Sequence, residues 1–121
     1  MHNLLVATAV LEGATGLALV ALPSQLATLL LGSSLDAPAA LTLARVAGVA
    51  LVALAVTCWL ARHDGQSRAA RGLVGAMVLY HTGVAIVLAY ANIGLAVSGP
   101  ALWPTVLFHA AMTAWCVTTL R

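Results

Sequence analysis

The sequence predicts an all-α fold: a polytopic integral membrane protein, built as an up-down bundle of four transmembrane helices. Of the 121 residues, 63% are hydrophobic and only 7% are charged, whereas soluble domains carry roughly 25% charged residues. The apolar residues form four stretches, each near the roughly 20 residues that cross a bilayer core of about 30 Å. This length allows one four-helix transmembrane domain, residues 1–121, and no extramembrane domain.

The first span is expected at about residues 4–22, where Pro23 ends or kinks the helix. It is read as a retained helix and not a cleaved signal peptide, because residues 1–3 lack Lys and Arg and Glu12 interrupts the apolar stretch. Two interpretations of residues 24–32 stay open: the segment continues the span beyond a kink, or it lies along the membrane surface.

Three further spans follow, separated by short turn-rich or polar segments. Their connections are short, so neighbouring helices are expected to be antiparallel. Pro104 is tolerated in the first turn of the last span. The expected spans are about residues 39–61, 72–96 and 101–120.

The arginines predict the orientation of the bundle. Loop 62–71 carries three of them and Arg121 closes the chain, whereas the first and third loops have neither Lys nor Arg. The positive-inside rule therefore places both termini and loop 62–71 in the cytoplasm. Trp59 and Trp115 fall near the expected inner interface and Trp103 near the outer one, as in the aromatic belts of membrane proteins.

Each span carries one ionisable residue, and these four residues form a polar belt: Glu12, Arg45, His81 and His109. At 1.5 Å per residue, Glu12 and His81 lie roughly 12 and 13 Å from the cytoplasmic side. Arg45 and His109 lie roughly 9 to 12 Å below the outer face. Ionisable residues inside a membrane are costly and mark candidate functional sites, so these four are the candidate catalytic residues.

Each belt residue also has a purely structural interpretation. Glu12 and Arg45 are expected to form an ion pair that joins the first two spans, because each is costly alone in hydrocarbon. His81 and His109 either bridge adjacent helices by hydrogen bonds or act as acid/base groups and ligands of haem iron. His2 and His63 are expected to be solvated.

Composition excludes some classes of partner and site. A formal net charge of +2, spread along the chain, does not form the basic patch that nucleic-acid binding needs. Cys58 and Cys116 lack the C-x-x-C spacing of a zinc or redox pair, and no metal is predicted. Small residues such as Gly13, Gly16 and Gly48 favour close helix packing, within one bundle or between the copies of a homo-oligomer.

The first half of the chain resembles the DoxX-like small bacterial membrane proteins. The resemblance rests on Pro23, on the run Leu29-Leu30-Leu31-Gly32 and on Leu43-Ala44-Arg45-Val46-Ala47-Gly48. It implies a four-helix bundle in the bacterial cytoplasmic (inner) membrane. Some members of that group are linked to quinone-dependent sulfur oxidation, and distant relatives include sterol isomerases with acid/base residues in a membrane cavity. Arg45 is the only belt residue that the resemblance covers.

Three functions follow from these observations. In the first, Glu12, Arg45, His81 and His109 form a site that binds an apolar small molecule or a cofactor, haem b or a quinone, or acts on it by acid/base chemistry. In the second, the protein is a structural or accessory subunit of a larger membrane complex. In the third, it is a proton-coupled transporter that uses Glu12, since a glutamate in the first of four spans resembles the small multidrug resistance exporters. The lipid bilayer surrounds the protein in all three, and whether it is an enzyme stays open.

Overall fold

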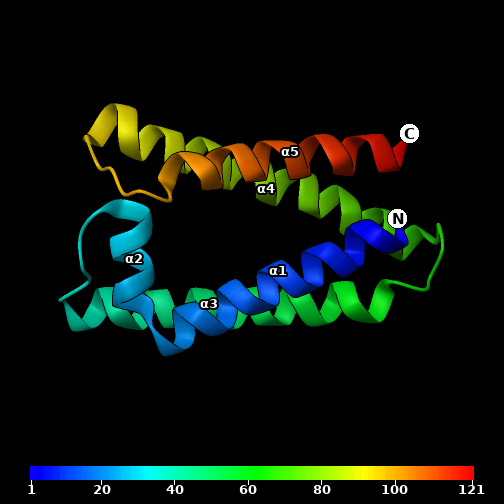
Figure 1. Ribbon diagram of the computed structural model, residues 1–121. Coiled ribbons are helices and arrows are strands. Elements are labelled where there is room, and N and C mark those ends of the chain that lie inside the picture. The colour runs from blue at the N-terminus through cyan, green and yellow to red at the C-terminus, as the bar shows by residue number, and fades with distance from the viewer. The chain divides into compact units, whose positions relative to one another are not determined.

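The computed structural model describes residues 1–121 as five helices without strands, which confirms the all-α fold class. Their bounds are α1 (His2–Ala21), α2 (Pro23–Leu31), α3 (Pro38–Ala61), α4 (Arg68–Leu95) and α5 (Leu102–Leu120). In Figure 1, α1 lies along α3, and α4 lies along α5. The chain forms two compact units: unit 1 contains residues 1–28 and 34–66, and unit 2 contains residues 29–33 and 67–121.

Three helices are long and apolar enough to cross a membrane: α1, α3 and α4, with 20, 24 and 28 residues. Their composition is compatible with a membrane location. Helix α5 is 19 residues long and contains four threonines and His109, and it is not among these three.

The break after the first span produces a separate helix. Leu22 leaves helical geometry, with φ −132° and ψ 52°, and Pro23 has no N–H to continue the hydrogen bonding of α1. The following segment, left open by the sequence, is α2, and in Figure 1 it runs across the direction of α3. Ser24 Oγ accepts a hydrogen bond from the N–H of Leu35 at 3.1 Å, which ties the connection after α2 back to its first turn.

The helix bounds otherwise follow the expected spans closely, except at the start of α4. Ser67 caps this helix, because its hydroxyl oxygen accepts a hydrogen bond from the N–H of Ala70 at 3.1 Å. Helix α4 therefore begins at Arg68, four residues before the expected start at Gly72. Arg68 and Arg71 lie in its first turn and not in a loop.

Unit 1 is held by a close crossing of α1 and α3. A Cβ atom placed on Gly16 would lie 2.7 Å from the carbonyl oxygen of Gly48, and one placed on Gly48 would lie 2.7 Å from the carbonyl oxygen of Gly16. Further along, a Cβ atom on Gly13 would lie 3.4 Å from that of Ala55, so the two helices are antiparallel. In a membrane, where apolar burial supplies little drive, such close backbone approach is a main source of association.

Unit 2 is held by the antiparallel packing of α4 and α5. Its apolar core contains Leu88, Leu102 and Val106, and Leu30 and Leu31 pack against it. The connection between the helices is anchored by backbone hydrogen bonds, since Ala101 donates its N–H to the carbonyl oxygen of Leu29 at 2.9 Å. At the opposite end, Arg71 Nη2 donates to the carbonyl oxygen of Leu120 at 3.0 Å.

Candidate functional site

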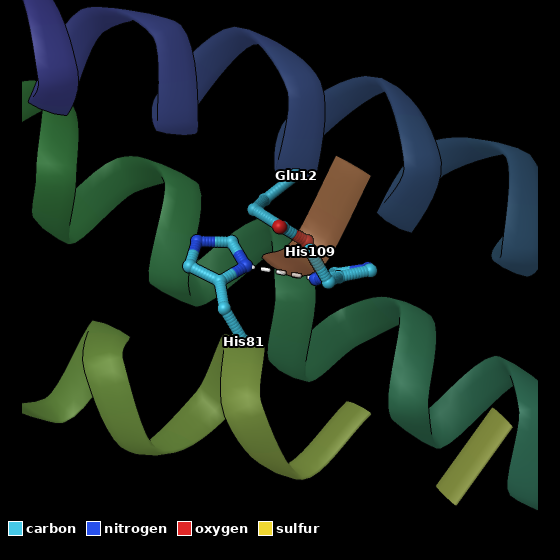
Figure 2. Close-up of side chains that lie close together, drawn as sticks. All are labelled: Glu12, His81 and His109. Carbon is cyan, nitrogen blue, oxygen red and sulfur yellow. Dashed lines mark hydrogen bonds between the residues drawn. The ribbon is translucent and has the colours of Figure 1, made fainter. Parts of the chain in front are cut away.

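His81 and His109 are brought into direct contact inside unit 2. The antiparallel register of α4 and α5 places the two residues opposite each other, and their Nδ1 atoms lie 2.8 Å apart (Figure 2). Both side chains are buried, with 0% and 7% of their surfaces exposed. The two histidines that the sequence assigned to adjacent spans at similar depth therefore form one hydrogen-bonded pair.

The contact fixes how protons are arranged in the pair. A neutral imidazole has one N–H and one lone pair, so one Nδ1 donates to the other. The donating ring then has a bare Nε2, and the accepting ring carries its own proton on Nε2. His81 Nε2 is buried and has no hydrogen-bond partner. The two tautomers are exchanged when the donating ring gains a proton at Nε2, the shared proton crosses the 2.8 Å contact, and the other ring loses its Nε2 proton. These three transfers together make up one passage of a proton relay.

Aromatic rings enclose the histidine pair. The Tyr80 ring lies 5.0 Å from the His81 ring and 5.8 Å from the His109 ring, measured between centroids. The Phe108 ring lies 5.3 Å from the His109 ring, edge to face. Tyr80 and Phe108 are thus aromatic neighbours of the buried pair.

A pair of threonines lies beside the histidines and joins the same two helices. Thr113 Oγ1 donates to the carbonyl oxygen of His109 at 2.9 Å. Its single proton is therefore used, and in the 3.4 Å contact between Thr82 Oγ1 and Thr113 Oγ1 the donor is Thr82. Thr82 and Phe108 were not among the site residues predicted from the sequence. Thr82 could have been identified from its position, because it follows His81 in the chain and Thr113 lies one turn after His109 on the adjacent helix.

The arrangement of the pair differs from that of two axial haem ligands. Imidazole nitrogens bind metal ions at about 2.0–2.1 Å, so two nitrogens on opposite faces of a haem lie about 4 Å apart, with the macrocycle between the rings. Here Nδ1 of His81 lies 2.8 Å from Nδ1 of His109, and the ring centroids are 5.0 Å apart. In this conformation the two histidines fit each other and not a haem between them.

An open apolar groove of about 430 Å³ runs along α4 next to the pair. Its lining includes Leu79, Tyr80, Gly83 and Val87. Tyr80 belongs both to the groove wall and to the aromatic enclosure of the histidines. Pockets for small molecules combine such apolar walls with a few polar groups, and Tyr80 is the only polar side chain in this lining.

Glu12 lies on the buried face of α1 in unit 1, with 4% of its surface exposed. The same face carries Leu5, Thr8 and Gly16, at the three- and four-residue spacing of one side of a helix. Figure 2 also draws this carboxylate, which comes from unit 1, whereas both imidazoles come from unit 2. Its burial agrees with an inward-facing ionisable group.

The expected ion pair between Glu12 and Arg45 is not formed, and this part of the prediction is wrong. Arg45 is exposed, and its Nε donates to the carbonyl oxygen of Val20 at 3.3 Å. Because Gly13 packs against Ala55, Glu12 lies near the level of Ala55, ten residues and about 15 Å along α3 from Arg45. Side chains at such different levels cannot meet.

Comparisons of the chain with protein-family models, with curated proteins and with solved structures found no match. The similarity to DoxX-like proteins therefore stays a prediction that rests on the residues named above.

Proposed function

We propose that this protein binds an apolar small molecule within the membrane, beside the His81–His109 pair, and that the pair transfers protons to and from that molecule. The observation that carries this proposal is the 2.8 Å contact between two buried imidazoles. It is supported by the groove along α4, whose wall shares Tyr80 with the enclosure of the pair.

A completed passage of one proton through the pair leaves both imidazoles neutral. One imidazole takes a proton from the ligand at its bare Nε2 and passes its Nδ1 proton to the other ring. That second ring then releases its Nε2 proton to another atom of the ligand or to a nearby acceptor. Each passage leaves the two tautomers exchanged, and a return passage resets them. Isomerisation and proton abstraction next to a carbonyl group are reactions of this kind.

Glu12 enters the proposal through its expected depth, roughly 12 Å against 13 Å for His81. A carboxyl group inside the membrane is a further candidate for acid/base chemistry. Arg45 has a different role, which is to hold the end of α1.

The groove favours a ligand that is apolar over most of its surface and carries one or two polar atoms for the histidines. Quinones and ketones of sterol-like shape have this character. The haem variant requires the two imidazoles to separate, and it predicts a Soret band in the absorption spectrum of the purified protein.

The test is to identify what copurifies with the protein in a mild detergent. We expect mass spectrometry to find an apolar, non-phospholipid compound with the wild type and to find it lost from the double variant His81→Phe/His109→Phe. Leu107→Phe, at an exposed position of α5, is the control and should retain the compound. A compound that stays with the double variant, or a wild type without one, would contradict the proposed site and favour an accessory role.

We further propose that α5 crosses the membrane as well, which gives four spans with both termini in the cytoplasm of a bacterial cell. The proposal is supported by the length of α5, by its packing along α4 and by the arginines at residues 62, 68, 71 and 121.

Single cysteines test this topology in a background in which Cys58 and Cys116 are replaced by Ala. Ser98→Cys should react with a membrane-impermeant maleimide in intact cells. Asp64→Cys and Arg121→Cys should react only after permeabilisation. Reaction of Ser98→Cys and Arg121→Cys from the same side would rule out a crossing by α5.

A further inference from the structure

A second open groove, of about 250 Å³, follows the seam between α1 and α3 in unit 1. Residues Val10, Gly13 and Leu17 of α1 line it on one side, and Val52, Val56 and Trp59 of α3 line it on the other. None of its lining residues is charged, and Trp59 is the only one with a polar side-chain atom. From Val52 to Trp59 the groove is about 10 Å long at the rise of an α-helix, and it runs lengthwise along the helix pair.

A cluster of basic side chains lies at the Trp59 end of this groove. The Arg62 guanidinium stacks on the Trp59 ring at 4.0 Å and also donates a hydrogen bond to the carbonyl oxygen of Trp59. His2 donates from Nδ1 to the carbonyl oxygen of Arg62 at 3.0 Å, and the His63 ring lies 5.0 Å from the His2 ring. We call His2, Arg62 and His63 the cationic cluster.

His2 and His63 are exposed, which agrees with the expectation that they are solvated, and they also make contacts within the cationic cluster. One hydrogen bond and one ring contact join His2, near the start of unit 1, to Arg62 and His63, near its end. Because Nδ1 of His2 donates to the carbonyl oxygen of Arg62, Nε2 of His2 can donate to a phosphate only in the imidazolium form. The remaining N–H groups of Arg62 form a planar fork, which suits phosphate oxygens.

We propose that one anionic phospholipid binds to unit 1, with its phosphate at the cationic cluster and an acyl chain in the groove between α1 and α3. Trp59 marks the membrane interface between the two, where tryptophan side chains are enriched. Anionic headgroups concentrate in the cytoplasmic leaflet, which is the side expected for loop 62–71. This lipid site is separate from the histidine pair of unit 2.

Charge complementarity favours a lipid over a second copy of the chain. A helix from another copy would fill the apolar groove, but it offers no phosphate to the basic residues at its mouth. A phospholipid offers a phosphate to the basic residues and an acyl chain to the groove. The acyl chain runs along the membrane normal, and the groove runs lengthwise along the helix pair.

The test uses the full chain in nanodiscs that contain phosphatidylglycerol and phosphatidylcholine in equal amounts, followed by native mass spectrometry. We expect the wild type to retain one phosphatidylglycerol. Arg62→Gln should lower this apparent affinity about tenfold, because a hydrogen bond to a charged group is lost. Arg68→Gln is the matched control, since it removes the same charge near the same loop and should retain the lipid.

The groove is tested separately by a bulky residue at its rim. Val56→Trp should fill the groove and lower lipid retention. Val49→Trp should not, because Val49 is also an exposed residue of α3 but lies outside the groove. Equal retention by all variants, or no preference of the wild type for phosphatidylglycerol, would overturn the proposal. A wild-type dimer that Val56→Trp dissociates would assign the groove to a second copy and would overturn it as well.

Discussion

Arg45 donates its Nε hydrogen to the carbonyl oxygen of Val20, at 3.3 Å, across the two helices of unit 1. Val20 lies in the last turn of α1, where carbonyl groups lack partners within the helix. The arginine of the second apolar stretch is therefore a cap for the end of the first helix. It has this function because the chain breaks at Leu22 and Pro23.

Replacing Arg45 by Met should change the free energy of unfolding by less than about 1 kcal/mol, because two effects oppose each other. The hydrogen bond from a charged donor contributes about 1.5–3 kcal/mol, and a charged residue in the membrane costs about 2.5–3.5 kcal/mol near the centre and less near the interface. Unfolding by SDS in a mild detergent, followed by circular dichroism, measures the difference. A loss of about 3–5 kcal/mol, the cost of breaking a buried ion pair, would indicate that Arg45 pairs with a carboxylate after all.

Gly16→Ala should destabilise unit 1 by about 1–2 kcal/mol. The added methyl group would meet backbone atoms of Gly48 and Val52 within 3 Å, and such overpacking costs about 1–3 kcal/mol. Gly75→Ala is the control, because nothing lies within 4 Å of an added Cβ atom there. That change should be neutral or stabilising, by up to about 1 kcal/mol of helix propensity. Equal effects of the two substitutions would mean that the close crossing of α1 and α3 is not maintained in the membrane.

His81→Phe and His109→Phe should each destabilise the protein by about 1–3 kcal/mol, since each leaves one buried imidazole without its partner. The double variant should be close to the wild type, because both polar groups are then removed together. The coupling energy of this double-mutant cycle in SDS unfolding measures the contact directly. Additive effects of the two substitutions would contradict a direct hydrogen bond between the rings.

Gly32→Ala should cost more than Gly65→Ala, although both glycines have a positive φ, 74° and 63°. An alanine in this left-handed region costs about 1–2 kcal/mol by itself. At Gly65 nothing else lies within 4 Å of the added atom, whereas at Gly32 it would overlap the carbonyl oxygen of Ser98. Expression level and unfolding in SDS compare the two, and a larger effect at Gly65 would contradict the packing of residues 29–33 against the connection between α4 and α5.

The helices themselves could be predicted from the sequence because the lipid environment demands long apolar stretches that proline, glycine and polar residues interrupt. The helix at 38–61 was expected at 39–61, and the helix at 102–120 at 101–120. The early start of α4 could not be predicted from hydropathy, because the hydroxyl of Ser67 determines it.

The pairing of side chains was harder to predict than the helices. His81 and His109 were expected at similar depth on adjacent antiparallel helices, and they do meet. Glu12 and Arg45 carry opposite charges and were expected to form an ion pair, but they lie at different positions along the axes of α1 and α3. Depth counted from the ends of a span locates a residue only to within a turn or two, and it says nothing of which way the side chain faces. In a membrane helix that is apolar on every side, the sequence gives little further information about facing.

The connection between Ala101 and Leu29 has a practical consequence for dividing the gene. Residues 29–33 belong to unit 2, although they precede α3 in the chain. If the two halves 1–66 and 67–121 were produced as independent polypeptides, the second would lack the acceptor for the Ala101 N–H and the side chains of Leu30 and Leu31. A cut at the polar loop would thus leave α1 and α3 together in one fragment, whereas the fragment with α4 and α5 would lack residues 29–33 of its unit. Complementation would require these five residues of the first fragment to pack against the second fragment.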